Sequence, residues 1–232
     1  MKKYLGVELG STRIKGVVID ESFAPVESGD FEWESTYDHG IWTYDLADAR
    51  EGLCQVLSQL KDREGLAAAG ISGMMHGYLA FDKDWNLLVP FRTWQNTITA
   101  DAAERLTELF QFNVPQRWSI AHLYQAILNG EPHVGQIAHI TTLSSYVHYM
   151  LTGENVVGVG EASGMFPIDS ATGNWNEEML KKFETLTQDQ PWNIRDVLPR
   201  VLLAGQDAGR LTASGSAWVE GLLPEGLPCG PP

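Results

Sequence analysis

The fold is decided in Tyr4-Leu5-Gly6-Val7-Glu8-Leu9-Gly10-Ser11-Thr12-Arg13-Ile14-Lys15-Gly16-Val17-Val18-Ile19-Asp20, where two short apolar runs flank a turn. Residues 4–9 and 14–20 are rich in apolar and β-branched side chains, as strands are, and Gly10-Ser11-Thr12 supplies turn chemistry. Because so few residues separate the runs, we expect them to pair as an antiparallel hairpin and not through a crossover helix.

Helix and strand patterns alternate along the rest of the chain. A third strand is predicted at residues 29–36 and a buried strand at 66–72. Apolar residues at helical spacing predict helices at 45–63, 100–110, 120–128, 143–151 and 177–183. This order is typical of a mixed α/β domain that opens with a hairpin.

The composition describes an acidic, folded domain. There are 30 acidic and 16 basic side chains, and the formal net charge of −14 argues against a nucleic-acid binder, which needs a basic surface. No apolar stretch approaches the roughly 18 residues of a membrane span, and Glu8 and Arg13 interrupt any apolar export segment. Two cysteines, Cys54 and Cys229, are too few for a disulfide framework or a zinc site. We therefore expect a cytosolic, cytoplasmic protein.

The turn between the first two strands is the first candidate site. Small and hydroxylated residues such as Gly10, Ser11 and Thr12 let backbone N–H groups approach a phosphate, and Lys15 adds charge. Glu8 could hold Mg²⁺ through water, since Mg²⁺ keeps much of its hydration shell. The same pattern also fits an ordinary hairpin turn. It lacks the Gly-Lys-Ser/Thr of a Walker A loop and the spaced glycines of a dinucleotide-binding turn.

Two further segments present groups suited to a sugar. Gly70-Ile71-Ser72-Gly73-Met74-Met75-His76-Gly77 places His76 at a predicted strand end, where a neutral imidazole can donate and accept hydrogen bonds to a polyol or ketose. The alternative is a histidine that only satisfies a turn. Trp94 beside Gln95 and Asn96 offers an apolar face next to amides, although a core tryptophan beside a polar loop fits equally. The other histidines lack metal-ligand spacing, and only the role of His122 is left open.

Taken together and in this order, the segments resemble the FGGY carbohydrate kinases, and most of all their xylulokinase branch. The opening turn is similar to the family's phosphate loop, and residues 70–77 are similar to its Gly-Ile-(Ser/Ala)-Gly-Gln-Met-His-Gly. Trp94-Gln95-Asn96 stands where the family has Trp-Asn-Asp or Trp-Gln-Asp. Leu151-Thr152-Gly153-Glu154 and Glu161-Ala162-Ser163-Gly164 resemble its Leu-Thr-Gly-Glu and Asp-Ala-Ser-Gly. The resemblance spans nearly the whole chain.

The resemblance implies a fold, cofactors and site residues. The fold would be α/β and ribonuclease-H-like, with the mixed sheet of actin and hexokinase and flanking helices. The cofactors would be ATP and Mg²⁺, with no protein side chain bound directly to the metal. The expected sugar contacts are Met75, His76, Trp94 and Asn96. The residues expected near the nucleotide phosphates are Gly10, Ser11, Thr12, Arg13 and Lys15, with Glu8 near the metal.

The sequence departs from the family pattern at several points. Glu8 replaces the usual Asp, Asn96 replaces an acid, and the segment 118–122 replaces a small-residue stretch ending in Pro-Lys. In the family the general base is an Asp in a Gly-rich segment, which we expect directly after Pro232, followed by an ATP-binding C-terminal domain. Residues 1–232 are therefore expected to be the N-terminal sugar-binding domain, inactive alone.

The function expected from the resemblance is ATP-dependent phosphorylation of a ketose or a related sugar or polyol hydroxyl by the full-length protein. A non-catalytic sugar-binding or regulatory module of the same fold is the alternative, and an unrelated α/β domain with coincidental motifs is a third. The expected partner is a small-molecule sugar, not a nucleic acid or a membrane. The identity of the sugar and the oligomeric state, a homodimer included, are left open.

Overall fold

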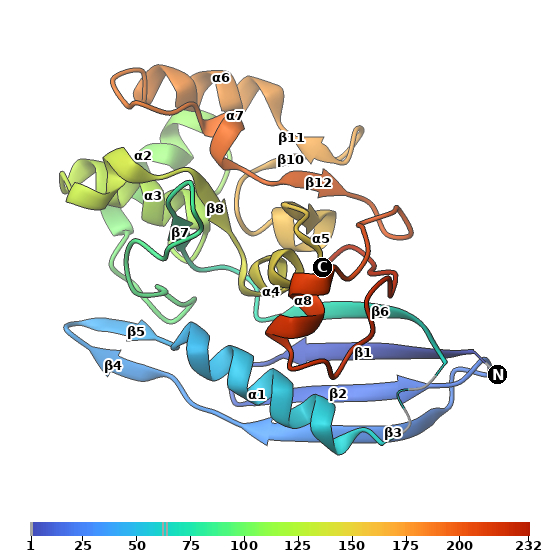
Figure 1. Cartoon of the computed structure of the whole chain (residues 1–232). Coiled ribbons are helices and arrows are strands. Elements are labelled where there is room, and N and C mark those ends of the chain that lie inside the picture. Colours follow the sequence, from blue (N-terminus) through green and yellow to red (C-terminus); the bar gives the residue numbers. More distant parts are fainter. Residues whose placement is uncertain (1, 62, 64) are drawn as a thin grey trace.

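The computed structural model describes residues 2–61, 63 and 65–232, and Figure 1 shows a lower part built on a sheet and an upper, mainly helical part. The chain is mixed α/β, as predicted. In chain order the elements are β1 (Lys3–Leu9), β2 (Arg13–Ile19), β3 (Pro25–Glu32), β4 (Thr36–Asp38), β5 (Ile41–Thr43), α1 (Leu46–Gln59), β6 (Leu66–Gly73), β7 (Leu79–Phe81), α2 (Ala100–Phe110), α3 (Ser119–Leu128), η1 (Pro132–Gln136), β8 (His139–Thr141), α4 (Leu143–Thr152), β9 (Val156–Gly158), α5 (Val159–Ala162), β10 (Ile168–Asp169), β11 (Asn174–Trp175), α6 (Glu177–Leu186), α7 (Ile194–Val197), β12 (Arg200–Leu202) and α8 (Ala213–Trp218).

The main sheet has the strand order β3-β2-β1-β6. β1 and β2 pair antiparallel, with Leu9 opposite Ile14, which confirms the predicted hairpin. β6 pairs parallel with β1 and places Gly73 opposite Leu9. A parallel pair needs a crossover connection, and α1 is the helix of that crossover. The carboxyl ends of β1 and β6 therefore meet at the same end of the sheet.

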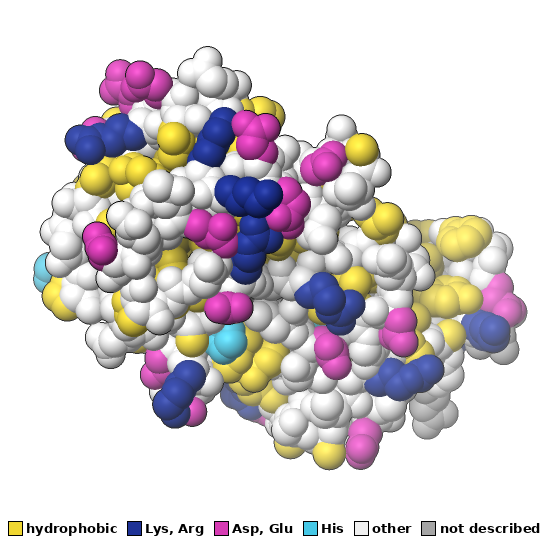
Figure 2. All heavy atoms as spheres, turned by 90° about the horizontal axis from the view of Figure 1, so that it is seen from above, with side chains coloured by type: hydrophobic (Ala, Val, Ile, Leu, Met, Phe, Trp, Pro, Cys, Tyr) yellow, Lys and Arg dark blue, Asp and Glu magenta, His cyan; other side chains and the backbone are white. Residues whose placement is uncertain are grey.

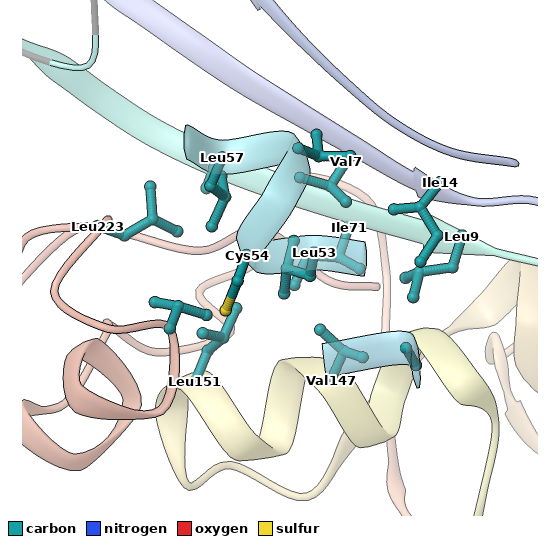
Figure 3. Packing of buried hydrophobic residues seen from close by; sticks show 14 of the residues in the cluster. Val7, Leu9, Ile14, Leu53, Cys54, Leu57, Ile71, Val147, Leu151 and Leu223 are labelled. Carbon is teal, nitrogen blue, oxygen red and sulfur yellow. The ribbon is translucent and has the colours of Figure 1, made fainter. Parts of the chain in front are cut away.

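Helices cover one face of this sheet. Along β1 the side chains of Val7 and Leu9 are buried, while Gly6 and Glu8 are exposed, which is the period-two pattern of a strand covered on one side. Figure 3 shows the buried side chains of the sheet gathered in one cluster with those of α1 and α4. The opposite face, which carries Glu8 and Lys15, stays exposed in this chain.

α1 lies close against the sheet because glycines stand at the contact. A Cβ atom added to Gly52 would lie 2.5 Å from Cδ1 of Phe31 and 2.7 Å from Cδ1 of Ile14. A Cβ atom added to Gly16 would lie 2.6 Å from Cγ1 of Val56. Such distances leave no room for a side chain, so the crossover helix has one tightly packed position over β2 and β3.

The upper part has its own core, which contains buried polar groups. Tyr78 is fully buried in it, and its hydroxyl is hydrogen-bonded to Nε2 of His133 at 2.9 Å. Arg92 and Glu131 form a largely buried ion pair beside them. The His122 ring stacks on Tyr78 with centroids 6.1 Å apart, and neither of its nitrogens has a hydrogen-bond partner among the described residues. His122, whose role the sequence left open, is therefore a core side chain.

Two predicted elements have an end that differs by four residues in the structure. The third strand is β3 at Pro25–Glu32, not 29–36, because the Asp20 carboxylate accepts hydrogen bonds from the Ser22 and Ala24 amides and closes a tight turn after β2. The predicted helix at 45–63 ends at Gln59, where Leu60 takes an extended backbone. Residue 62 of that prediction lies outside the described residues.

The surface seen from above in Figure 2 mixes both signs of charge, with basic side chains beside acidic ones. Arg195 illustrates this arrangement, because its guanidinium binds Glu177 and Glu184. Within the described ranges, none of the helices has the length and apolar character that crossing a lipid bilayer requires.

Replacing His122 by Phe should reduce the loss of stability at acid pH. Burial lowers the pKa of His122 from 6.5 to about 3. Between these values the unfolded chain binds a proton that the folded chain does not, so His122 contributes stability above pH 6.5 that is lost as the pH falls toward 3. The free energy of unfolding, measured by urea denaturation between pH 4 and 7, should depend less on pH in H122F.

The matched control is His39→Phe, because His39 is exposed in the turn between β4 and β5. Its slope, compared with that of H122F, separates the effect of burial from the effect of losing an imidazole. Equal slopes for H122F and the wild type would show that His122 does not carry the acid sensitivity.

Candidate functional site

The turn between β1 and β2 is held by aromatic side chains on one side. The carbonyl of Gly10 accepts a hydrogen bond from Nε1 of Trp33 at 2.7 Å, and the carbonyl of Ser11 accepts one from the Tyr44 hydroxyl at 2.5 Å. The carbonyl of Thr12 accepts one from the Trp33 amide at 3.2 Å. Three consecutive carbonyl oxygens, which would repel an anion, are thus already paired, two with aromatic side chains and one with the Trp33 backbone amide.

The segment that follows β6 carries His76 in an unusual backbone conformation. His76 has a φ of 70° and Gly77 a φ of 92°, the left-handed region that few side chains adopt. The Gly77 amide donates to the carbonyl of Arg117 at 2.9 Å, and its carbonyl accepts from Oγ of Ser119 at 2.6 Å. These bonds from the start of α3 stabilise the strained turn and fix the position of the imidazole.

The imidazole of His76 is suited to neutral hydrogen bonding. Partial burial holds the pKa of His76 below its ordinary value, the Gly164 carbonyl opposes this shift, and the nearby Arg117 charge adds to it. Nδ1 of His76 lies 3.4 Å from the carbonyl oxygen of Gly164. At neutral pH the ring is therefore uncharged, and it can donate at one nitrogen and accept at the other.

These two segments meet at one hollow of about 340 Å³. It is lined by Glu8, Gly10, Ser11, Gly73, Met74, Met75, His76 and Trp94. Met75 and Trp94 present 39% and 42% of their surface, which leaves apolar area available to a ligand. The structure thus brings together six of the residues singled out in the sequence. They are Glu8, Gly10, Ser11, Met75, His76 and Trp94.

The other residues predicted near the phosphates lie beside this hollow. Thr12 and Arg13 line a neighbouring depression, and the Arg13 guanidinium forms ion pairs with Asp30 and Glu32. Nζ of Lys15 lies 3.5 Å from Oε2 of Glu8, and both side chains are about half exposed. Arg13 is thus held by two acids, whereas the contact between Lys15 and Glu8 is loose and screened by solvent.

Glu8 connects the hollow to the exposed face of the sheet. It also lines a shallow depression of about 430 Å³ there, together with Lys15, Gly6, Gly70 and Ser72. Gly6 and Gly70 are opposite each other in the β1–β6 pair, so these two positions contribute no side chain to the depression.

Asn96 is not among the described residues that line the hollow. It is 3% exposed, and its Nδ2 donates to the carbonyl of Trp42 at 2.8 Å while its Oδ1 accepts from the Trp42 amide at 2.9 Å. Nδ2 also donates to the carbonyl of Thr93 at 3.0 Å. The amide thereby ties β5 to the loop that carries Trp94.

Two groups that contact the His76 segment were not assigned a role from the sequence. Arg117 supplies the carbonyl that binds the Gly77 amide, and no pattern around it indicated this. Gly164 packs so closely that an added Cβ atom would lie 2.4 Å from Nδ1 of His76. The sequence motif Glu161-Ala162-Ser163-Gly164 could have indicated the role of Gly164. The described residues contain no group of three or more His, Cys, Asp or Glu side chains that could hold a metal ion.

Comparison with known proteins agrees with the sequence motifs. The sequence model of the N-terminal domain of the FGGY family of carbohydrate kinases matches residues 3–225. The xylulose kinase of Staphylococcus xylosus is 23% identical over 229 residues, which cover 91% of this chain and 45% of that enzyme. The chain thus spans less than half the length of the curated relatives it matches.

Solved structures share the fold. The xylulose kinase of Rhodospirillum rubrum superposes with a TM-score of 0.82 at 22% identity, over 99% of this chain and 48% of that one. A gluconate kinase from Lactobacillus acidophilus gives a TM-score of 0.80 at 17% identity, over 98% and 47% of the two chains. These likenesses confirm the expected actin- and hexokinase-type fold.

Replacing Asn96 by Asp, the acid that the resemblance leads one to expect, should destabilise the domain. The carboxylate would lose the bonds that Nδ2 donates to the Trp42 and Thr93 carbonyls, and it would bury a negative charge beside these two oxygens. A cost of about 2 kcal/mol is expected, because hydrogen bonds are lost and a buried charge faces carbonyl oxygens. Chemical denaturation measures it, with Asn113→Asp at an exposed position as the control. Equal stability of N96D and the wild type would contradict this role.

Proposed function

The chain belongs to the FGGY family of carbohydrate kinases, and we propose that residues 1–232 form the sugar-binding domain of a protein that phosphorylates a ketose or polyol hydroxyl with ATP. The ATP-binding domain and the general base, an aspartate, belong to a part of the protein outside these residues. The curated relatives that carry the name xylulose kinase favour a ketose such as xylulose. We also infer that the protein acts in the cytosol on a small, soluble sugar.

One observation carries the proposal: the N-terminal turn and the Met75–His76 pair line the same hollow, with Trp94 beside them. Phosphoryl transfer depends on holding the sugar hydroxyl and the phosphates at one place, so both binding segments must share a cleft. Had bulk protein separated them, a kinase function would have no structural basis.

The sugar end of the hollow has suitable chemistry. The exposed faces of Trp94 and Met75 match the C–H groups of a sugar, and the neutral His76 matches its hydroxyls as donor and acceptor. Gly164 and Arg117 hold His76 in place before the sugar arrives. Asn96 acts behind this surface by fixing the Trp94 loop, and a direct sugar contact from it would require that loop to move.

The phosphate end fits ATP and Mg²⁺, which would supply the phosphoryl group and neutralise its charge. The carbonyls of residues 10–12 are paired on the side of Trp33 and Tyr44, so the backbone presents little negative charge to a phosphate from those oxygens. Gly10 and Ser11 line the hollow directly, and Lys15 can leave its loose contact with Glu8 to meet a phosphate. Glu8 would then be free to accept hydrogen bonds from metal-bound water. Thr12 and Arg13 line the neighbouring depression, and the charge of Arg13 is already neutralised by Asp30 and Glu32.

The test is ADP release by the full-length protein with a panel of D-xylulose, D-ribulose, glycerol and gluconate. We expect turnover with a ketose or polyol and a loss of about tenfold to a hundredfold in kcat/KM for His76→Ala and for Trp94→Ala, because each removes one or two contacts with the sugar. His39→Ala, an exposed histidine, is the matched control and should keep full activity.

Binding without turnover would favour the alternative, a non-catalytic sugar-binding or regulatory module of the same fold. That outcome is read by calorimetry with the same panel. Neither turnover nor binding with any sugar or polyol would overturn both functions.

A further inference from the structure

Tyr78 and Arg92 join the two segments that carry the expected sugar contacts. The Tyr78 amide donates to the Arg92 carbonyl at 2.8 Å, and the Arg92 amide donates to the Tyr78 carbonyl at 3.2 Å, which makes an isolated antiparallel bridge. His76 lies two residues before Tyr78, and Trp94 lies two residues after Arg92. The Tyr78–Arg92 bridge therefore ties the backbone that carries His76 to the backbone that carries Trp94.

The two segments are also in close contact beside the bridge. A Cβ atom added to Gly77 would lie 2.6 Å from the carbonyl oxygen of Arg92 and 2.9 Å from Cε2 of Phe91. Such distances leave no gap between the segments. A movement of the backbone at Arg92 is therefore transmitted to Gly77, the neighbour of His76.

The side chains of both bridge residues are held by one short segment of the upper part. Tyr78 and Arg92 are 0% and 5% exposed. Nη1 of Arg92 donates to Oε1 of Glu131 at 3.3 Å, and Nη2 donates to Oε2 of the same carboxylate. The Tyr78 hydroxyl is hydrogen-bonded to Nε2 of His133 at 2.9 Å, and Cζ of Arg92 lies 5.5 Å from the centre of the Tyr78 ring. Glu131 directly precedes η1 and His133 lies within it, so one segment holds both ends of the bridge.

The Glu131 carboxylate is itself anchored in the upper core. The Glu131 amide donates to the Ala126 carbonyl of α3 at 3.0 Å. Nδ2 of Asn129 donates to Oε1 of Glu131 at 3.2 Å, and Nδ1 of His133 lies 3.5 Å from Oε2. Both carboxylate oxygens therefore have neighbours besides Arg92, which fix their position.

A largely buried ion pair at this place needs a reason. Apolar side chains of similar volume would often make the core equally stable or more stable, because they avoid the cost of removing two charges from water. They could not reproduce the direction of a two-point contact between a guanidinium and a carboxylate. The pair thus contributes a defined position more than it contributes stability.

We propose that Arg92 and Glu131 are positioning residues for the sugar, whose ion pair fixes the Tyr78–Arg92 bridge and through it the placement of His76 and Trp94. Neither Arg92 nor Glu131 is among the described residues that line the hollow, so the pair acts through the bridge and not by touching the sugar. The part of the proposal that concerns sugar rests on the proposed function. The part that concerns the bridge rests on the contacts of the ion pair alone.

The first experiment measures amide hydrogen exchange of the full-length protein without sugar. Arg92→Met/Glu131→Leu replaces both charges by apolar groups and so leaves no unpaired charge in the core. We expect the Tyr78 and Arg92 amides and those of residues 93–96 to exchange about tenfold faster, because the bridge opens more often. Arg92→Lys keeps the charge but offers one nitrogen in place of two, and it should give a smaller increase. Arg195→Met, which removes an exposed ion-pairing arginine on α7, is the matched control and should leave these amides unchanged.

The second experiment measures sugar affinity and steady-state kinetics of the same variants. We expect R92M/E131L to raise the Kd and KM of the sugar about tenfold, while kcat and the KM of ATP change less than threefold, and R92K to lie between it and the wild type. A general loss of stability would instead speed exchange in α1 and α6 as well, and the amides of those helices are followed in the same run.

Unchanged exchange at Tyr78 and Arg92 in the double variant overturns the proposal, as does an equal rise in the KM of sugar and of ATP. Should the double variant fail to fold, R92K decides alone, and no increase at the two bridge amides would overturn the proposal as well. If the wild type binds no sugar, the proposed function fails, and the exchange result still decides whether the ion pair holds the bridge.

Discussion

The parallel pairing of β1 with β6 is the constraint from which the candidate site follows. It sets Leu9 opposite Gly73, so the two chain segments that leave these strands start from the same end of the sheet. One segment is the Gly10–Thr12 turn and the other contains Met75 and His76. Neither segment could line a common hollow if β6 were antiparallel or shifted by several residues. The pairing depends in turn on α1, which Gly52 and Gly16 allow to pack tightly over the sheet.

Each segment at this end of the sheet is held by hydrogen bonds from residues outside the hollow. Trp33 and Tyr44 bind the carbonyls of the N-terminal turn, and Asn96 binds both backbone groups of Trp42. Arg117 and Ser119 bind Gly77 in the same way. Such second-layer contacts matter because a ligand site works only when its groups are in place before the ligand binds. They also explain why a strained φ at His76 persists, since the surrounding bonds leave it no other conformation.

Much of this arrangement could be predicted from the sequence. The hairpin, the strand at 66–72 and most helices follow from apolar periodicity, and the motifs around Glu8, His76 and Trp94 identified the segments that line the hollow. The third strand was misplaced because its start depends on the side-chain hydrogen bonds of Asp20, which periodicity does not record. The family resemblance implied that Asn96 contacts the sugar, whereas in the structure its amide is turned toward the Trp42 backbone.

Residue types and their local spacing were enough to predict the strand and helix periods, the sharp turns at glycine-rich segments and the family. Which side chains reach the hollow depends on tertiary packing. Arg13 and Lys15 are two residues apart in one strand, but Arg13 is held by Asp30 and Glu32 across the β2–β3 pair while Lys15 meets Glu8. The carbonyl oxygen of Gly164 lies 3.4 Å from Nδ1 of His76, which is 88 residues earlier in the chain. Contacts between residues so far apart in the chain depend on how whole elements pack, and local sequence carries no record of that packing.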